Sequence, residues 1–179
     1  MWKTPSVILI SGIMAAGKST VAEALARRLP RAVHLRGDVF RRMVVSGREE
    51  MTAEPSAEAW RQLRMRYDLA AAAADRYATA GFTVVLQDVI LGPELPAMVD
   101  RIRHRPLAVV VLAPSPEVVA AREEARDKQG YGDWPVAELD AEFRATTPHI
   151  GLWLDSSALT SARTVDEILA RAWLDGRVG

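Results

Sequence analysis

Residues 12 to 20 read Gly-Ile-Met-Ala-Ala-Gly-Lys-Ser-Thr, which matches the phosphate-binding P-loop pattern G-x-x-x-x-G-K-[ST] in full. The apolar run 7–10 precedes the motif, so a buried strand leads into a glycine-containing turn and then into a helix that begins near Lys18. The backbone N–H groups of such a turn and the N-terminal end of the helix bind phosphate groups. In this pattern Lys18 reaches the β- and γ-phosphates, and the Ser19 hydroxyl ligates the Mg²⁺ ion that bridges them.

The motif predicts ATP and Mg²⁺ as the cofactors of this chain. An ordinary tight connection between a strand and a helix is the alternative, and the Gly-Lys-Ser triplet after a buried strand argues against it. The predicted nucleotide contacts are Gly12, Ala15, Ala16, Gly17, Lys18, Ser19 and Thr20.

A second candidate is Asp38, which follows the predicted strand 32–35 in the sequence Arg36-Gly37-Asp38. Ligands of open parallel sheets bind beyond the carboxyl ends of the strands, so Asp38 could face the γ-phosphate and accept the proton of a substrate hydroxyl. We predict that Asp38 is the general base. An N-cap for the helix-like segment 39–43 is the alternative, and the two roles can coexist.

Asp88 follows the apolar residues 84–86, in the manner of a Walker B segment. We predict that it holds Mg²⁺ through water or orients the acceptor. The alternatives are a cap for the next helix and an ion pair with a neighbouring arginine.

Arg122 and Arg126 are four residues apart and share one face of a predicted helix, ahead of the glycine-containing segment 130–132. We predict a lid around residues 122–135, in which both arginines neutralise the charge that develops during phosphoryl transfer. A solvated helix whose arginines pair with adjacent acidic residues is the alternative.

Strand-like and helix-like segments alternate along the chain, which is typical of an α/β fold with helices on both faces of a parallel sheet. We expect one domain over residues 1–179, a P-loop kinase-type three-layer α/β/α structure with a central, mostly parallel five-stranded sheet. The expected strands are 7–11, 32–35, 83–86, 107–112 and 150–154, and the expected helices are 18–29, 55–80, 94–103, a segment after Pro116, and 165–174.

The chain has 23 basic and 23 acidic residues, so its zero formal charge implies no attraction to nucleic acid or to an anionic membrane. It contains no cysteine, which excludes disulfides, thiol catalysis and a cysteine zinc site. The N-terminus lacks a secretory apolar stretch, and no run approaches the roughly 20 apolar residues of a membrane span. These features predict a cytoplasmic enzyme with a small-molecule partner, and they indicate no particular oligomeric state.

The histidines and two aromatic residues carry weaker information. His34, His104 and His149 lie in separate segments without metal-ligand spacing, so we expect no zinc site and no catalytic histidine. Trp60 and Tyr67 recur at helical spacing, which suits either an acceptor pocket or the core.

The segments G-I-M-A-A-G-K-S-T, R-G-D-V-F, V-L-Q-D-V-I-L-G and A-R-E-E-A-R resemble, in order and approximate spacing, those of the chloramphenicol phosphotransferase-like family of small P-loop kinases. The resemblance implies that Asp38 is the base for an acceptor hydroxyl and that Lys18 and Ser19 contact phosphate and magnesium. It also implies that Arg122 and Arg126 are lid arginines. Residues 39–70 differ from that family's drug-binding regions, so the acceptor stays open among antibiotics and nucleoside- or sugar-like molecules.

Two other functions stay open at this point. A nucleoside monophosphate kinase would phosphorylate a phosphate group, although the Asp38 carboxylate would repel such an acceptor. An ATP-dependent regulatory module would bind nucleotide without phosphorylating a small molecule. A conventional GTPase is disfavoured, because the chain contains no asparagine and therefore no N-K-x-D element.

Overall fold

The computed structural model describes residues 4–125 and 135–179. Within these residues six strands form one sheet in the order β2-β3-β1-β4-β5, with β6 paired to β4. The first five strands are parallel to their neighbours, and β6 is antiparallel to β4. The strands are β1 (Val7–Ser11), β2 (Ala32–Arg36), β3 (Thr83–Gln87), β4 (Leu107–Leu112), β5 (Leu152–Leu154) and β6 (Arg177–Val178).

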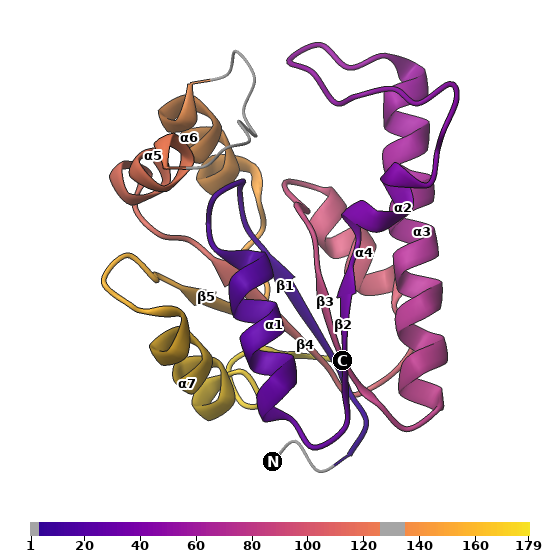
Figure 1. The fold of residues 1–179 in the computed structure, drawn as a ribbon, viewed down its shortest axis with the longest axis vertical. Coiled ribbons are helices and arrows are strands. Elements are labelled where there is room, and N and C mark those ends of the chain that lie inside the picture. The colour runs from indigo at the N-terminus through magenta and orange to yellow at the C-terminus, as the bar shows by residue number, and fades with distance from the viewer. Residues whose placement is uncertain (1–3, 126–134) are drawn as a thin grey trace.

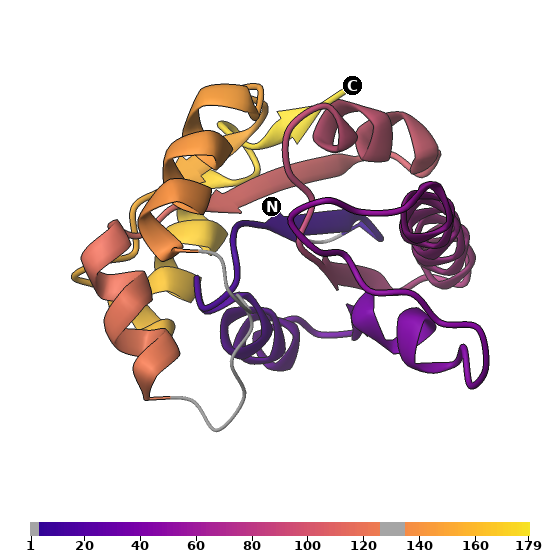
Figure 2. The same cartoon turned by 90° about the horizontal axis from the view of Figure 1, so that it is seen from above.

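Helices cover both faces of the sheet (Figures 1 and 2). Helices α1 and α7 pack against each other on one face, and α3 and α4 contact each other on the opposite face. Right-handed connections between parallel strands require this distribution for the observed strand order. The expected three-layer α/β/α fold is therefore confirmed. The helices are α1 (Lys18–Arg28), α2 (Asp38–Arg42), α3 (Ala57–Thr79), α4 (Glu94–Arg101), α5 (Pro116–Glu124), α6 (Val136–Thr146) and α7 (Ser161–Arg171).

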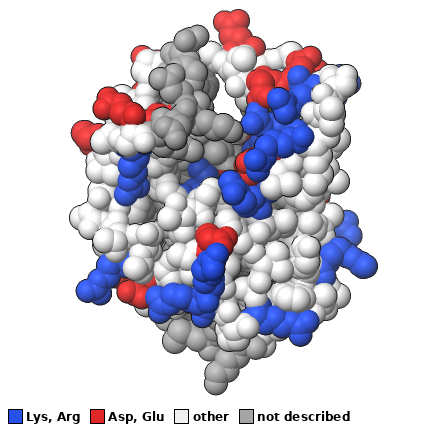
Figure 3. All heavy atoms as spheres, viewed as in Figure 1, with Lys and Arg blue, Asp and Glu red and all other residues white. Residues whose placement is uncertain are grey.

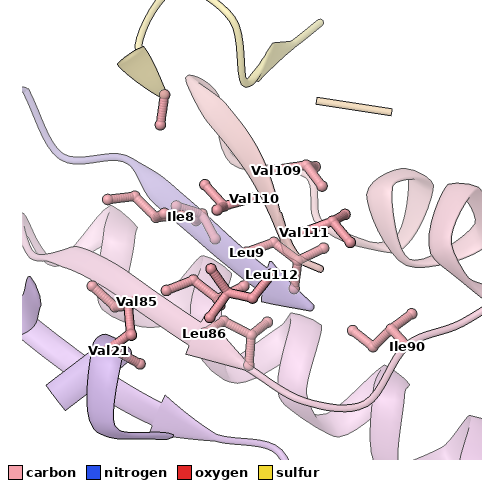
Figure 4. Packing of buried hydrophobic residues seen from close by; sticks show 14 of the residues in the cluster. Ile8, Leu9, Val21, Val85, Leu86, Ile90, Val109, Val110, Val111 and Leu112 are labelled. Carbon is pink, nitrogen blue, oxygen red and sulfur yellow. The ribbon is translucent and has the colours of Figure 1, made fainter. Parts of the chain in front are cut away.

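The core lies along β1, β3 and β4, which are buried over their whole length. Figure 4 shows side chains of these three strands in contact, among them Ile8, Leu86 and Val110. Parallel strands that are covered on both faces have continuous apolar sequences of this kind. The buried side of α3 is rich in alanine, and such small side chains allow its backbone to lie close to the sheet.

Helix α4 ends two residues earlier than the sequence suggests. The backbone N–H groups of Arg103 and His104 donate to the Asp75 carboxylate of α3, with N···O distances of 2.9–3.1 Å. These two groups are therefore satisfied outside the helix, and the chain leaves it after Arg101.

Strand β5 is also shorter than expected, because it begins at Leu152 rather than at Ile150. Gly151, with φ of +75°, lies so close to β4 that a Cβ atom there would be 2.4 Å from the Val109 carbonyl oxygen. Only glycine fits this position, and extended pairing starts after it.

Two elements were not predicted, and one was displaced. Helix α6 and the two-residue strand β6 lie in segments for which the sequence pattern predicts no helix or strand. Helix α7 begins at Ser161 instead of 165, because the Thr160 hydroxyl accepts a hydrogen bond from the Arg163 N–H at 3.2 Å and caps the helix there.

None of the helices in the described part of the chain is long and apolar enough to cross a lipid bilayer.

The cap of α7 gives a test of this helix boundary. We expect Thr160→Ala to lower the free energy of unfolding by about 1 kcal/mol, because a backbone N–H loses its acceptor. Thr160→Ser keeps the hydroxyl and should retain most of the stability. Urea denaturation of the two variants measures the difference, and equal stabilities would contradict the assigned cap.

Candidate active site

The P-loop connects β1 to α1 at the carboxyl end of the central strand, as the sequence predicts (Figure 1). Its backbone has positive φ at Gly12 (140°), Ala15 (57°) and Gly17 (94°). A Cβ atom at Gly12 would lie 2.4 Å from the carbonyl oxygen of Leu112, so this glycine permits close contact with β4. Lys18 folds back over the loop, and its Nζ donates to the Ile13 carbonyl oxygen at 2.7 Å.

A cavity of about 400 Å³ opens beside the P-loop. It brings together predicted site residues from four separate segments of the sequence: Lys18 and Ser19, Asp38, Asp88, and Arg122. The strand order explains this, because β1, β3 and β2 are neighbours and their carboxyl ends meet at one edge of the sheet. The complete lining is Met14, Ala15, Gly17, Lys18, Ser19, Thr20, Asp38, Gln87, Asp88, Val89 and Arg122.

Asp38 is the first residue of α2 and follows Gly37, which occupies the N-cap position. The alternative interpretation of Asp38 as the N-cap is therefore wrong by one residue. Its carboxylate lies 3.2 Å from Arg42 and 3.7 Å from Arg36, and the side chain is 37% exposed. Asp38 thus reaches the cavity from a position between two arginines.

Basic side chains gather on this side of the cavity. Figure 3 shows blue atoms over the region where Figure 1 places α2 and the N-terminal part of α3. Arg41 and Arg48 both pair with Glu50 there, close in sequence to the two arginines beside Asp38. The surroundings of Asp38 are therefore richer in positive charge than the neutral chain as a whole.

Asp88 lies at the end of β3, and its side chain is 4% exposed. Oδ1 accepts hydrogen bonds from Arg66 Nη2 at 2.6 Å and from the Val89 N–H at 2.8 Å, whereas Oδ2 has no hydrogen-bond partner among the described residues. Burial raises the pKa of the Asp88 carboxyl above its ordinary value, and Arg66 lowers it only in part. The ion pair with an arginine, which was the alternative interpretation of Asp88, is present, and it leaves Oδ2 without a partner among the described residues.

Gly37 makes room for this carboxylate. A Cβ atom at Gly37 would lie 2.0 Å from Asp88 Oδ2, although the backbone there is an ordinary right-handed helical one (φ −61°, ψ −32°). The Gly37 N–H also donates to the Gln87 carbonyl oxygen at 3.0 Å, which joins the start of α2 to the end of β3. Gly37 therefore lies against the Asp88 carboxylate and directly precedes Asp38 in the chain.

Arg122 lies against the P-loop rather than on a solvated helix face. Its Nη1 donates to the Ala16 carbonyl oxygen at 3.4 Å, and its Nη2 donates to the Ser156 carbonyl oxygen at 3.3 Å. Both hydrogen bonds are long, and both acceptors are neutral. Arg126 lies outside the described residues, and so does most of the predicted lid.

A smaller cavity of about 230 Å³ is also lined by Arg122. It shares the P-loop and the start of α1 with the larger cavity, and the loop between β5 and α7 closes its far side. The lining is Ala16, Gly17, Thr20, Val21, Arg122, Ser156, Leu159, Ser161 and Thr164.

Several sequence candidates lie elsewhere. Tyr67 is a core residue whose hydroxyl donates to the Val89 carbonyl oxygen at 2.6 Å, and Trp60 is 37% exposed beside Arg64. Neither aromatic residue lines the larger cavity.

The three histidines lie at three separate places. His34 pairs with Glu23, His104 contacts the Pro5 carbonyl oxygen, and His149 stacks on Trp153. No two of them converge on one site.

Sequence reasoning missed Arg66. This residue shares the buried side of α3 with Ala70, at a spacing that directs it toward the sheet. A charged residue at a core-facing helical position is uncommon unless it has a partner. The position of Arg66 in the helical pattern was therefore the signal in the sequence that could have identified it.

The strand–P-loop–helix unit at one end of a sheet in the order β2-β3-β1-β4-β5 is that of the P-loop kinase-like fold. More particularly, residues 7–148 match the AAA_33 family, described as "AAA domain", and the chain belongs to this family. A comparison with curated proteins gives no match.

Solved structures with this fold include several small kinases. A sugar kinase from Janibacter sp. HTCC2649 superposes with a TM-score of 0.68 at 18% identity, over 96% of this chain and 95% of its own. An APS kinase from Mycobacterium tuberculosis, in complex with AMPPNP and APS, gives 0.72 at 16% identity, over 93% and 96%. A tunicamycin resistance protein from Deinococcus radiodurans gives 0.68 at 16% identity, over 99% of each chain. At these identities the likeness establishes the fold.

The contact between Gly37 and Asp88 can be tested by substitution. We expect Gly37→Ala to lower the free energy of unfolding by about 1–3 kcal/mol, because the new methyl group displaces the buried carboxylate. In the Asp88→Ala background the clash is gone, so the same substitution should cost clearly less, because only the preference of the N-cap position for glycine over alanine remains. Thermal or urea unfolding of the four proteins measures both steps. An equal loss of stability in the two backgrounds would refute the contact.

Proposed function

We propose that this protein is an ATP-dependent phosphotransferase that moves the γ-phosphoryl group to a hydroxyl of a small molecule. The observation that carries the proposal is the convergence of Lys18, Ser19, Asp38, Asp88 and Arg122 on one cavity at the carboxyl ends of three neighbouring strands. Phosphoryl transfer depends mainly on positioning and charge neutralisation, and this set of residues supplies both.

The residues present fit Mg²⁺. Hard oxygen atoms are its preferred ligands, and the residues that line the cavity include Ser19, with its hydroxyl, and Asp88, whose buried Oδ2 has no partner among the described residues. Within the described residues no group of three or more His, Cys, Asp or Glu side chains could hold a metal ion, which suits an ion that is held mostly by phosphates and water. We assign Ser19 and Asp88 to the magnesium site, where the bound ion would neutralise charge on the β- and γ-phosphates.

The nucleotide would lie across the P-loop. Its phosphates bind the backbone N–H groups of residues 12–18, and Lys18 exchanges the Ile13 carbonyl oxygen for a phosphate oxygen. The smaller cavity, between Arg122 and the loop before α7, accommodates the base and ribose. Arg122 lines both cavities, so we assign its guanidinium group the role of neutralising the transferring phosphoryl group.

Asp38 acts on the acceptor. Its carboxylate takes the proton of the acceptor hydroxyl as the oxygen attacks the γ-phosphorus atom, and ADP leaves with the electron pair of the broken P–O bond. Arg42 and Arg36 hold the carboxylate at the edge of the cavity. These two arginines thus orient the base, while the P-loop orients the phosphate.

The proposed acceptor is a small molecule that carries a hydroxyl group. The resemblance to the chloramphenicol phosphotransferase-like family supports a hydroxyl-bearing antibiotic, or a nucleoside- or sugar-like molecule. The arginines around α2 give a specific reason to include acceptors that carry an anionic group in addition to the hydroxyl.

The purified protein should be incubated with γ-labelled ATP, Mg²⁺ and a panel of such compounds, and labelled products should be separated from free phosphate.

The role of Asp38 gives the central prediction. We expect Asp38→Asn to reduce the transfer rate by about 10²–10⁴-fold, because the amide cannot accept the hydroxyl proton. ATP binding should change little, since the P-loop is untouched. Labelled product and nucleotide affinity measure the two effects separately. Glu50→Gln is the matched control, because Glu50 also pairs with arginines near α2 but does not line the cavity. Unchanged turnover in Asp38→Asn would rule out Asp38 as the base.

A further inference from the structure

Two consecutive residues in the middle of α3 hold the end of β3. Arg66 Nη2 donates to Asp88 Oδ1 at 2.6 Å, and the Tyr67 hydroxyl donates to the Val89 carbonyl oxygen at 2.6 Å. The Val89 N–H is the second donor to Asp88 Oδ1. Helix α3 therefore fixes both the carboxylate and the peptide that supports it.

The pair is buried, with side-chain exposures of 12% for Arg66 and 4% for Asp88. It is nevertheless incomplete, because Arg66 Nε and Asp88 Oδ2 are buried and have no hydrogen-bond partner among the described residues. A buried ion pair contributes little stability compared with apolar side chains of similar size, and its unsatisfied atoms make it less favourable still. A role in the stability of the fold alone does not account for this arrangement.

The geometry fixes the direction of the unpartnered oxygen. Two donors hold Oδ1, so the carboxylate cannot rotate without losing them. Oδ2 lies against Gly37, and Asp88 is one of the residues that line the larger cavity together with Ser19. Without the Arg66 hydrogen bond, only the Val89 N–H would orient the group.

We propose that Arg66 is a positioning residue of the magnesium site: it holds Asp88 Oδ1 so that Oδ2 faces the metal and its water. The inference rests on the proposed function, because it takes Asp88 as part of that site. Arg66 itself touches neither nucleotide nor metal. Residues that hydrogen-bond to metal-binding carboxylates typically affect metal affinity or activity by about 10- to 100-fold when they are replaced.

The test measures binding, so it needs no acceptor. Calorimetric titration gives the affinity for AMPPNP in EDTA and at increasing Mg²⁺ concentrations. We expect Arg66→Met to raise the Mg²⁺ concentration for half-maximal effect by about 10- to 100-fold and to leave the affinity in EDTA nearly unchanged. Arg64→Met is the matched control, because Arg64 is also on α3 and pairs with a buried carboxylate, Glu94, outside the cavity. It should behave like the wild-type protein.

Two further variants separate positioning from folding. Arg66→Lys keeps a positive charge beside Asp88 but loses the planar guanidinium group, so it should fold and still show a raised Mg²⁺ requirement. In the Asp88→Asn background, Arg66→Met should have no further effect on the Mg²⁺ dependence, because Arg66 acts through the carboxylate. Circular dichroism checks the fold of each variant.

The outcomes distinguish the two proposals. If Mg²⁺ leaves the AMPPNP affinity of the wild-type protein unchanged, the proposed magnesium site is wrong. If the wild-type protein responds to Mg²⁺ and Arg66→Lys responds identically, the site stands and the positioning role of Arg66 is wrong. An equal effect of Arg66→Met with and without Asp88→Asn would also overturn that role. If Arg66→Met does not fold, the lysine variant decides.

Discussion

The burial of one carboxylate, that of Asp88, constrains the centre of this molecule. Placing an ionised carboxylate inside a protein costs several kcal/mol unless charge and hydrogen-bond donors compensate for it. Here the compensation comes from Arg66 on α3 and from the backbone of Val89, and the space comes from a missing side chain at Gly37. Helix α3, the end of β3 and the start of α2 must therefore fit together around a single group.

The strand order places this buried carboxylate in the candidate active site. Because β3 lies between β2 and the P-loop strand β1, the buried carboxylate sits between the phosphate-binding turn and Asp38. The alanine-rich side of α3 lets the helix approach the sheet closely enough for its polar side chains to reach the strand end. The site thus depends on the packing of a helix that contributes no residue to the lining of the larger cavity.

The sequence was sufficient for the architecture and for identifying residues that line one cavity, since the P-loop, Asp38, Asp88 and Arg122 follow strand ends or lie on an adjacent helix. Local patterns of two kinds, apolar runs and a glycine-rich motif, carry that information. They could not show that Arg66 meets Asp88 or that Gly37 faces its carboxylate, because these contacts depend on which side of a helix packs against which strand. Helix α6 and strand β6 were missed for a similar reason: β6 has only two residues and exists through its pairing with β4.

The hydrogen bond from Lys18 to the Ile13 carbonyl oxygen has a thermodynamic consequence. The lysine is already buried and ordered over its own loop, so a nucleotide gains little from ordering or desolvating it. Binding replaces the hydrogen bond to this carbonyl oxygen with one to a charged phosphate oxygen, which is the stronger of the two. The Lys18 ammonium group is therefore already ordered before a nucleotide binds. The free-energy cost of ordering it belongs to the folding of the chain and not to ligand binding.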